Sequence, residues 1–295
     1  MDCLPPEAAQ EASRRSAGAE SVVKVLGLPL APLSFLETLD EVERLINQAE
    51  PAFFITANTH YAMLSASEPA LQAVNAEAAF LVADGMPLVW AARLLGRRLP
   101  ERVAGADLVP ALCARAADRG FRVFLLGAAP GVALEAADRL QARDPALNIV
   151  GVEFPRIDEL AAEQHEELAE RIRESQADLL FAALGQPKGE LWLARHYREF
   201  GRAVCVQVGA SLDFAAGNVC RAPRWMQKTG LEWGHRLYRD PRRLLTRYAR
   251  NAAFLAATTL RGGIRRALAV VGESSRAWRL SSENGSPEGT EGRMS

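Results

Sequence analysis

Cysteine is scarce in this chain, and the few cysteines lack any diagnostic spacing. Cys3, Cys113, Cys205 and Cys220 are the only four in 295 residues. None of them stands at the short separation that zinc ligands or redox thiols require. We therefore expect reduced thiols in a cytoplasmic protein.

Long apolar runs are also missing. The best candidate near the C-terminus, residues 251–260, is bounded by Arg250 and Arg261 and falls well short of the roughly 18 apolar residues of a transmembrane helix. The N-terminus has neither the basic region nor the long apolar run of a signal peptide. These absences predict a protein that is at most peripheral to a membrane.

Several catalytic signatures are absent. The chain has no G-x-S-x-G elbow, no P-loop and no His/Cys/carboxylate set with metal-ligand spacing. It has no G-x-G-x-x-G, which argues against a dinucleotide oxidoreductase. It also lacks D-x-D, the metal-chelating motif of many sugar-nucleotide transferases. We expect neither a metal nor a cofactor, so arginines would have to stabilise a diphosphate leaving group.

Positive charge, in contrast, is concentrated in residues 221–250. This segment holds eight Arg and one Lys against two acidic residues, a net charge of +7 in a chain whose total is −1. Four aromatic residues are interleaved with the arginines, namely Trp225, Trp233, Tyr238 and Tyr248. The combination suits a lipid headgroup layer, a lipid-linked diphosphate or nucleic acid. A solvated helical face whose arginines pair with acids elsewhere is the other interpretation.

Short apolar runs alternate with longer amphipathic ones from Ser21 to about Arg202. This alternation predicts an α/β fold with a mainly parallel sheet that is covered by helices on both faces. The expected strands are 22–28, 52–56, 79–83, 122–126, 149–152, 179–184 and 204–208. The expected helices are 34–49, 86–95, 107–119, 131–143, 158–174 and 190–200.

The two ends of the chain differ from this pattern. Residues 1–20 and 281–295 are polar and lack periodicity, so both are predicted to be disordered tails. Residues 21–217 form the predicted α/β core. Residues 218–280, rich in Arg and Trp at their start, form a predicted helical appendage.

Polar residues follow several of the expected strands, where ligands bind in a parallel α/β sheet. Thr56 and Asn58 follow the second strand, and Asp84 follows the third. Helix capping is the competing role for each of them. Asp84, next to Gly85, would suit a general base. Asp107 is expected to cap the next helix, and Arg102 to reach a phosphate or pair with an acid.

Three further loops lie at the same sheet edge. The loop that begins at Gly127 precedes a helix, where backbone N–H groups can receive a phosphate or simply form a tight turn. Gln186 and Glu190 follow the next strand, and Asp213 follows the last one. With five such loops, the sequence predicts a binding site at this edge.

These pieces together resemble the WecG/TagA/CpsF family of bacterial glycosyltransferases. The resemblance spans roughly residues 22–260 in seven ordered blocks: TANTHYAML, LVADGMPLVWAARLLG, ERVAGADLV, RVFLLGAAPGVALEAADRL, DLLFAALGQPKGE, VQVGASLDFAAGNVCRAPRWMQKTGLEW and RLYRDPRRLLTRY. Seven blocks in order are far more specific than any single glycine loop in the chain.

The resemblance implies a Rossmann-like core and an appendage that covers the active site and meets the inner face of the cytoplasmic membrane. It implies an inverting, metal-independent transfer of N-acetylmannosamine, its uronic acid or another hexose from a UDP-sugar. The acceptor would be a polyprenyl-diphosphate-linked sugar in teichoic acid, common antigen or exopolysaccharide assembly. Nucleic acid is not an expected partner, and a homo-oligomer is left open.

The resemblance also assigns roles to individual residues. Asp84 matches the catalytic base, and Thr56 and Asn58 match a polar pair near the sugar. Arg102 and the Gly127 loop would help to place the donor. The appendage arginines Arg221, Arg224 and Arg236 would hold the diphosphate, in place of a metal.

One position departs from the family motif. Where the family usually reads G-x-P-x-Q-E, this chain reads Gly185-Gln-Pro-Lys-Gly189-Glu190. The expected Gln before Glu190 is therefore Gly189, and Gln186 is close in sequence only. The departure bears on sugar preference, and it leaves a catalytically inactive scaffold as one alternative. A nucleic-acid-binding module that uses the basic segment is a second, independent alternative.

Overall fold

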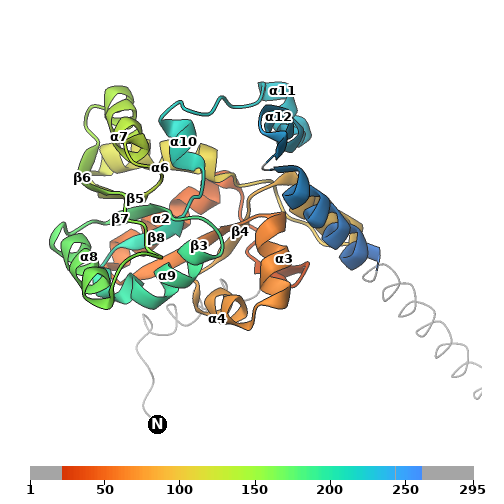
Figure 1. Cartoon of the computed structure of the whole chain (residues 1–295), viewed down its shortest axis with the longest axis horizontal. Helices are drawn as coiled ribbons and strands as arrows, with labels where there is room; N and C mark the ends of the chain where they lie inside the picture. Colours follow the sequence, from red (N-terminus) through yellow and green to blue (C-terminus); the bar gives the residue numbers. More distant parts are fainter. Residues whose placement is uncertain (1–21, 243, 261–295) are drawn as a thin grey trace, which may run out of the picture.

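The computed structural model describes residues 22–242 and 244–260, and a six-stranded sheet forms its centre (Figure 1). The strand order is β4-β3-β8-β7-β5-β6, and every neighbouring pair is parallel. The strands are β3 (Ala52–Ala57), β4 (Leu81–Ala83), β5 (Arg122–Gly127), β6 (Asn148–Glu153), β7 (Leu179–Ala183) and β8 (Val204–Gln207). Six of the seven predicted strands are thus confirmed to within two residues at each end.

Helices cover both faces of this sheet. One face is covered by α3 (Thr59–Ser67), α4 (Pro69–Glu77), α5 (Met86–Leu94), α8 (Ala162–Glu174), α9 (Lys188–His196) and the 3₁₀ helix η1 (Tyr197–Phe200). The other face is covered by α2 (Phe35–Gln48), α6 (Gly105–Arg119), α7 (Val132–Arg143) and α10 (Ser211–Ala215). The predicted Rossmann-like α/β architecture is confirmed.

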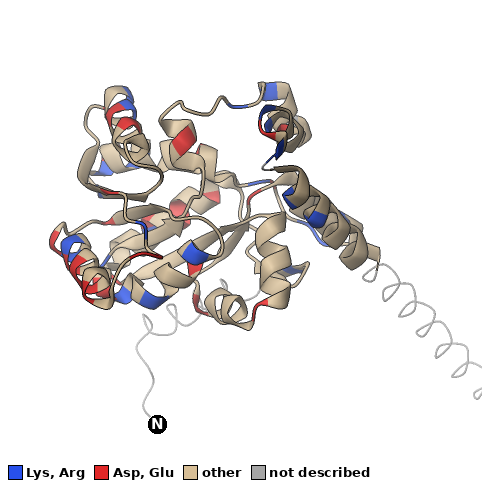
Figure 2. Ribbon diagram, viewed as in Figure 1, with Lys and Arg blue, Asp and Glu red and all other residues tan. Residues whose placement is uncertain are grey.

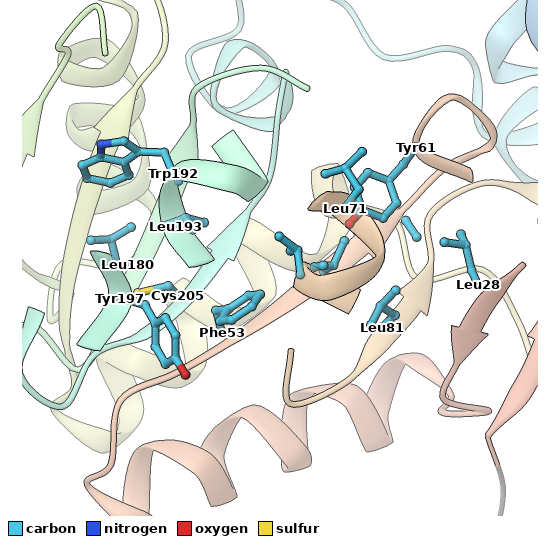
Figure 3. Close-up of a cluster of buried hydrophobic side chains, with 14 of the residues drawn as sticks. Leu28, Phe53, Tyr61, Leu71, Leu81, Leu180, Trp192, Leu193, Tyr197 and Cys205 are labelled. Atoms are coloured by element: carbon cyan, nitrogen blue, oxygen red, sulfur yellow. The ribbon is translucent and has the colours of Figure 1, made fainter. Parts of the chain in front are cut away.

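The apolar strands divide their side chains between two cores. On β3, Phe53 and Ile55 enter one core and Phe54 enters the other, because successive residues of a strand point to opposite faces. Figure 3 shows part of the first core, where Phe53 lies close to Tyr197 and Cys205. Burial on both faces explains why these strands show apolar runs instead of an alternating pattern.

The prediction of a single strand over residues 22–28 is wrong. These residues hold β1 (Val23–Val25), a turn and the first residue of β2 (Leu28–Leu30), which pairs with β1 as a hairpin. Leu26 and Gly27 both have positive φ, 51° and 89°, as the two-residue turns that join tight hairpins often require. The hairpin is antiparallel and lies outside the six-stranded sheet.

Helices α3 and α4 were not predicted from the sequence. Both are only nine residues long and are rich in Ala and Ser or other small and polar residues, so their amphipathic pattern is weak. Two local signals mark them nevertheless. Asn58 caps α3 through its side chain, and Pro69 stands in the first turn of α4.

Basic helices follow the α/β core. They are α11 (Arg224–Thr229), α12 (Glu232–Arg239) and the helical residues 244–260. Figure 2 shows basic residues on these helices, to the right of the sheet, and acidic residues along α8. Within the described ranges, no helix is long and apolar enough to cross a membrane. The predicted tails, and residues 261–280 of the predicted appendage, lie outside the described residues.

The junction between α11 and α12 approaches the core closely. Gly230 has φ of 77°, and a Cβ built on it would lie 2.6 Å from Met86 Cβ and 2.7 Å from the Trp90 ring. Leu244 is buried, and Phe254 and Leu255 pack against the core that includes α3 and α5. The basic helices therefore pack against the core, next to the ends of β3 and β4. The predicted division at Gly217 stays a prediction.

Candidate active site

A cavity of about 600 Å³ lies at the carboxyl ends of β3, β4, β7 and β8. The chain leaves β3 towards β4 on one side, whereas β8 lies on the other side of β3. Loops that diverge in this way leave a crevice, which is where open α/β sheets bind ligands. Side chains from α12 and from residues 244–260 form the remaining wall.

Thr56 and Asn58 line the cavity from the end of β3. The Thr56 hydroxyl donates to the backbone carbonyl of Gln207 at 3.1 Å. Asn58 Oδ1 accepts from the backbone N–H of Tyr61 at 3.0 Å, so the capping interpretation of Asn58 is confirmed. Its Nδ2 donates to Gln186 Oε1 at 3.2 Å. Asn58 thus caps a helix and also orders a polar side chain of the cavity.

Asp84 lines the cavity directly after β4. The alternative that it caps α5 is wrong, because the N-cap is Gly85 and no side chain makes a cap bond there. Burial raises the pKa of Asp84 to about 6, and the nearby charge of Glu232 adds to this effect. Arg102 and Arg236 act in the opposite direction and favour the charged form. A carboxylate whose pKa is near neutrality suits a general base.

An ion-pair network joins the core to the basic helices beside Asp84. Arg102 Nη1 lies 2.9 Å from Glu232 Oε2, and Arg102 Nη2 lies 3.5 Å from Asp107 Oδ2. Arg221 pairs with Asp107 at 2.8 Å and with Glu232 at 3.2 Å. Two guanidinium groups and two carboxylates thus form a closed, neutral ring. The expectation that Arg102 pairs with an acid is confirmed.

Asp107 does not cap α6, contrary to the sequence-based expectation. The helix begins two residues earlier, at Gly105, and its N-cap is Ala104. Asp107 therefore lies in the first turn, where a carboxylate is favoured by the helix dipole and reaches both arginines of the network. A Cβ on Gly105 would lie 2.8 Å from Ser211 Oγ, so the absence of a side chain at Gly105 permits the close approach of α6 to α10.

The remaining predicted residues divide into two groups. Arg102, Gln186, Asp213 and Arg236 line the cavity together with Asp84, Thr56 and Asn58. Gly127, Glu190, Arg221 and Arg224 are outside its lining. Gly127 approaches β7 so closely that a Cβ would lie 2.7 Å from the Ala183 carbonyl oxygen, and Arg224 is exposed.

Glu190 is buried behind the cavity instead of facing it. Its side chain is 1% exposed, Oε1 accepts from Gln186 Nε2 at 2.9 Å, and Oε2 has no hydrogen-bond partner among the described residues. Burial raises the pKa of Glu190 to about 7. Asn58, Gln186 and Glu190 therefore form one chain of hydrogen bonds that leads from the cavity into the core.

The cavity residues that sequence reasoning missed include three with polar or charged side chains next to the predicted ones: Gln207, Glu232 and Arg247. Gln207 had a visible signal, since it is the only polar side chain of the apolar strand β8. Glu232 is one of two acids among nine basic residues of the segment 221–250. Arg247 had no distinguishing signal among the arginines around it. Within the described part of the chain, no three His, Cys, Asp or Glu side chains gather as metal ligands.

Comparison with known proteins gives a consistent result. The family model described as "Glycosyl transferase WecG/TagA/CpsF family" matches residues 23–267. Two curated relatives carry the name N-acetylglucosaminyldiphosphoundecaprenol N-acetyl-beta-D-mannosaminyltransferase. The one from Bacillus spizizenii is 35% identical over 67% of this chain and 75% of its own length. The one from Bacillus subtilis is 30% identical over 70% of this chain and 78% of its own length. The chain belongs to the WecG/TagA/CpsF family of glycosyltransferases.

Proposed function

We propose that this glycosyltransferase moves a hexose from a UDP-sugar to a sugar that is linked to a polyprenyl diphosphate. The two relatives are named for transfer of N-acetylmannosamine to an undecaprenyl-diphosphate-linked N-acetylglucosamine, which supports a related donor and acceptor here. The product would serve cell-surface polysaccharide assembly. N-acetylmannosamine, its uronic acid and other hexoses are the candidate donor sugars.

Asp84 is the general base of this proposal, and its position carries the argument. It lies in the cavity at the end of β4, with a pKa of about 6. The carboxylate takes the proton of the acceptor hydroxyl as that oxygen attacks the anomeric carbon. The bond from this carbon to the UDP oxygen breaks on the opposite face, and UDP leaves with the electron pair. The configuration is therefore inverted and the proton remains on Asp84.

Arginines of the cavity are suited to the leaving group. Arg236 and Arg102 line the cavity, and both favour the charged form of Asp84. As UDP leaves, negative charge builds on its β-phosphate, and a guanidinium can stabilise that charge without a metal. Arg236 lies 5.6 Å from the Phe214 ring, measured from Cζ to the ring centre, a separation at which the aromatic face attracts a guanidinium. Arg221 and Arg224 would act on the acceptor diphosphate or through the network.

The exposed face of the basic helices fits a membrane surface. Trp225 and Tyr238 are 61% and 85% exposed, among basic side chains of α11 and α12. Amphipathic aromatics and cations together favour the interface of an anionic bilayer. We propose that the protein is cytoplasmic and docks peripherally on the inner face of the membrane, where a lipid-linked acceptor would reach the cavity.

The test is release of UDP from a panel of UDP-sugars, with a short-chain polyprenyl-diphosphate-GlcNAc acceptor and with EDTA present. The proposal expects acceptor-dependent release by the wild type that survives EDTA. Asp84→Asn should lower the rate by about 10²- to 10⁴-fold, with a folded protein as judged by thermal unfolding. Normal turnover by Asp84→Asn would reject the assigned base, and no turnover with any donor would reject the proposed reaction.

A further inference from the structure

The chain has Gly189 at the position where the family motif leads us to expect glutamine. Gly189 is buried in the first turn of α9. A Cβ built on Gly189 would lie 2.5 Å from Gln207 Cδ and 3.0 Å from Gln207 Oε1, and closer still to Nε2. Real Cβ atoms do not approach other heavy atoms this closely. The space that a side chain at position 189 would enter is therefore filled by the carboxamide of Gln207.

Gln207 makes bonds that a simple core residue would not make. It is the last residue of β8, is 3% exposed and lines the cavity. Its Oε1 accepts from the Leu184 N–H at 3.3 Å, and its Nε2 donates to the Gly185 carbonyl at 3.0 Å. A carboxamide has two donor hydrogens and two acceptor lone pairs. These two bonds use one donor hydrogen and one acceptor lone pair, and they leave one donor hydrogen and one lone pair for another partner.

The loop that Gln207 holds carries other polar groups of the cavity. Gln186, which follows Gly185, bonds to Asn58 and Glu190. The backbone carbonyl of Gln207 also accepts from the Thr56 hydroxyl. One wall of the cavity is thus a connected set of hydroxyl and amide groups. Hydroxyl and acetamido substituents of a hexosamine are the ligands that such a wall recognises.

We propose that Gln207 supplies from β8 the carboxamide that the family motif supplies from position 189, and that positions 189 and 207 act as a coupled pair in recognition of the donor sugar. The inference rests on the proposed function. According to this proposal, the carboxamide that is missing at Gly189 is not lost from the site but is supplied from position 207. The proposal also makes Gln207 a residue that determines specificity in this chain.

The proposal predicts that the effect of a substitution at position 189 depends on the residue at position 207, and the reverse. In Gly189→Gln the new side chain overlaps Gln207, so the loop or Gln207 has to move. In Gln207→Gly the carboxamide is lost and the Leu184 N–H loses this acceptor, whereas the Gly185 carbonyl keeps its bond from the Gly189 N–H. In the double variant, Gly189→Gln with Gln207→Gly, the new glutamine enters space that is now empty. Residues in direct contact of this kind are those whose substitutions are not additive.

The experiment compares these three variants with the wild type. It measures kcat and KM for each UDP-sugar at a fixed acceptor concentration, together with thermal unfolding. We expect each single variant to lower kcat/KM for the preferred donor about tenfold or more. The double variant should recover to within about threefold of the wild type, which is the sign of coupling. Gln207→Leu is the matched control, because it fills the space without an amide.

The outcomes separate this inference from the proposed function. Loss of donor discrimination in Gln207→Leu, with a wild-type melting temperature, supports a role for the amide in recognition. A folded double variant that is no better than the weaker single variant, beside an active wild type, overturns the coupled pair and leaves the proposed reaction intact. Absence of acceptor-dependent UDP release by the wild type overturns both.

Discussion

Arg102 of the core and Glu232 of α12 form an ion pair of 2.9 Å at the wall of the cavity. Both side chains are largely buried, and Arg221 and Asp107 complete the ring around them. The pair joins the basic helices to the core and lies beside Asp84, whose pKa responds to both of its members. Its two charges have opposite effects on that pKa, so the pair influences the candidate base as well as the packing of the helices.

Glu232→Gln should shift the pH profile of the enzyme. The negative charge of Glu232 raises the pKa of Asp84, so its removal lowers that pKa. The acid limb of kcat/KM, expected near pH 6 in the wild type, should move to lower pH. Two charged contacts are weakened, which should cost on the order of 2 kcal/mol of unfolding free energy. Glu232→Asp keeps the charge and is the control. An unchanged acid limb in Glu232→Gln would show that Asp84 does not sense this residue.

Asp84→Asn should stabilise the protein more at high pH than at low pH. The folded pKa of about 6 lies above the ordinary value of 3.8 for an aspartate, so the folded state binds this proton more tightly than the unfolded state. The resulting stabilisation is present below about pH 4 and is lost as pH rises through 6. A shift of this size corresponds to at most about 3 kcal/mol. Because the side chain is partly exposed to the cavity, we expect a smaller effect, on the order of 1 kcal/mol.

Melting curves of the wild type and Asp84→Asn at pH 4, 6 and 8 test this expectation. The gain in melting temperature should grow with pH and vanish at pH 4. Asp118→Asn, on α6 outside the cavity lining, is the control for the removal of one carboxylate from the core. A stabilisation that is equal at all three pH values would contradict the raised pKa.

The sequence predicted the sheet well because periodicity and strand length report burial directly. Strands such as β5 and β7 are buried on both faces, and this produces apolar runs that are easily read. The hairpin β1–β2 was not predicted because its turn requires positive φ at both Leu26 and Gly27. Of these two residues, only the glycine indicates such a conformation in the sequence. The short helices α3 and α4 escaped because nine residues give a weak pattern.

Only part of the site could be predicted, because the sequence identifies residues near strand ends but does not show where their side chains point. Asp84, Thr56 and Asn58 reach the cavity because they follow β4 and β3. Glu190 stands near a strand end as well, yet α9 turns it into the core. The partnership of Gly189 with Gln207 joins residues 18 positions apart on different elements, and local sequence carries no sign of it.

Glu190→Gln should preserve the fold and stabilise it above neutral pH. The Glu190 carboxyl is buried, and burial raises its pKa to about 7 from the ordinary value of 4.5 for a glutamate. The folded state therefore favours the proton, and this contribution is lost as pH rises through 7. A glutamine keeps an acceptor for Gln186 and carries no charge. Unfolding of the two proteins at pH 5 and pH 9 should give similar stability at pH 5 and a more stable variant at pH 9. A variant that is less stable at pH 9 would show that the charged form is the native one.

Asn58 combines two roles that a pair of variants can separate. Asn58→Asp keeps an oxygen to accept from the Tyr61 N–H but loses the N–H that donates to Gln186. We expect near wild-type stability and a rise in the donor KM, because Gln186 loses one of its two side-chain partners and keeps only Glu190. Asn58→Ala loses both bonds and should also cost about 1 kcal/mol of stability through the lost cap. Chemical denaturation and donor kinetics measure the two effects. Equal donor kinetics in wild type and Asn58→Asp would exclude a role for the bond to Gln186.

Trp225 and Tyr238 should determine the affinity of the protein for anionic membranes. Both are exposed on the basic helices, and burial of one such ring at the interface is worth more than 1 kcal/mol. We expect the double variant Trp225→Ala with Tyr238→Ala to bind phosphatidylglycerol vesicles at least about tenfold more weakly in a sedimentation assay. Binding should also weaken with salt, because the arginines contribute through screened charges. Leu36→Ala, at an exposed apolar residue of α2, is the matched control. If it weakens binding as much as the aromatic variant does, the membrane-facing surface is not the one that we propose.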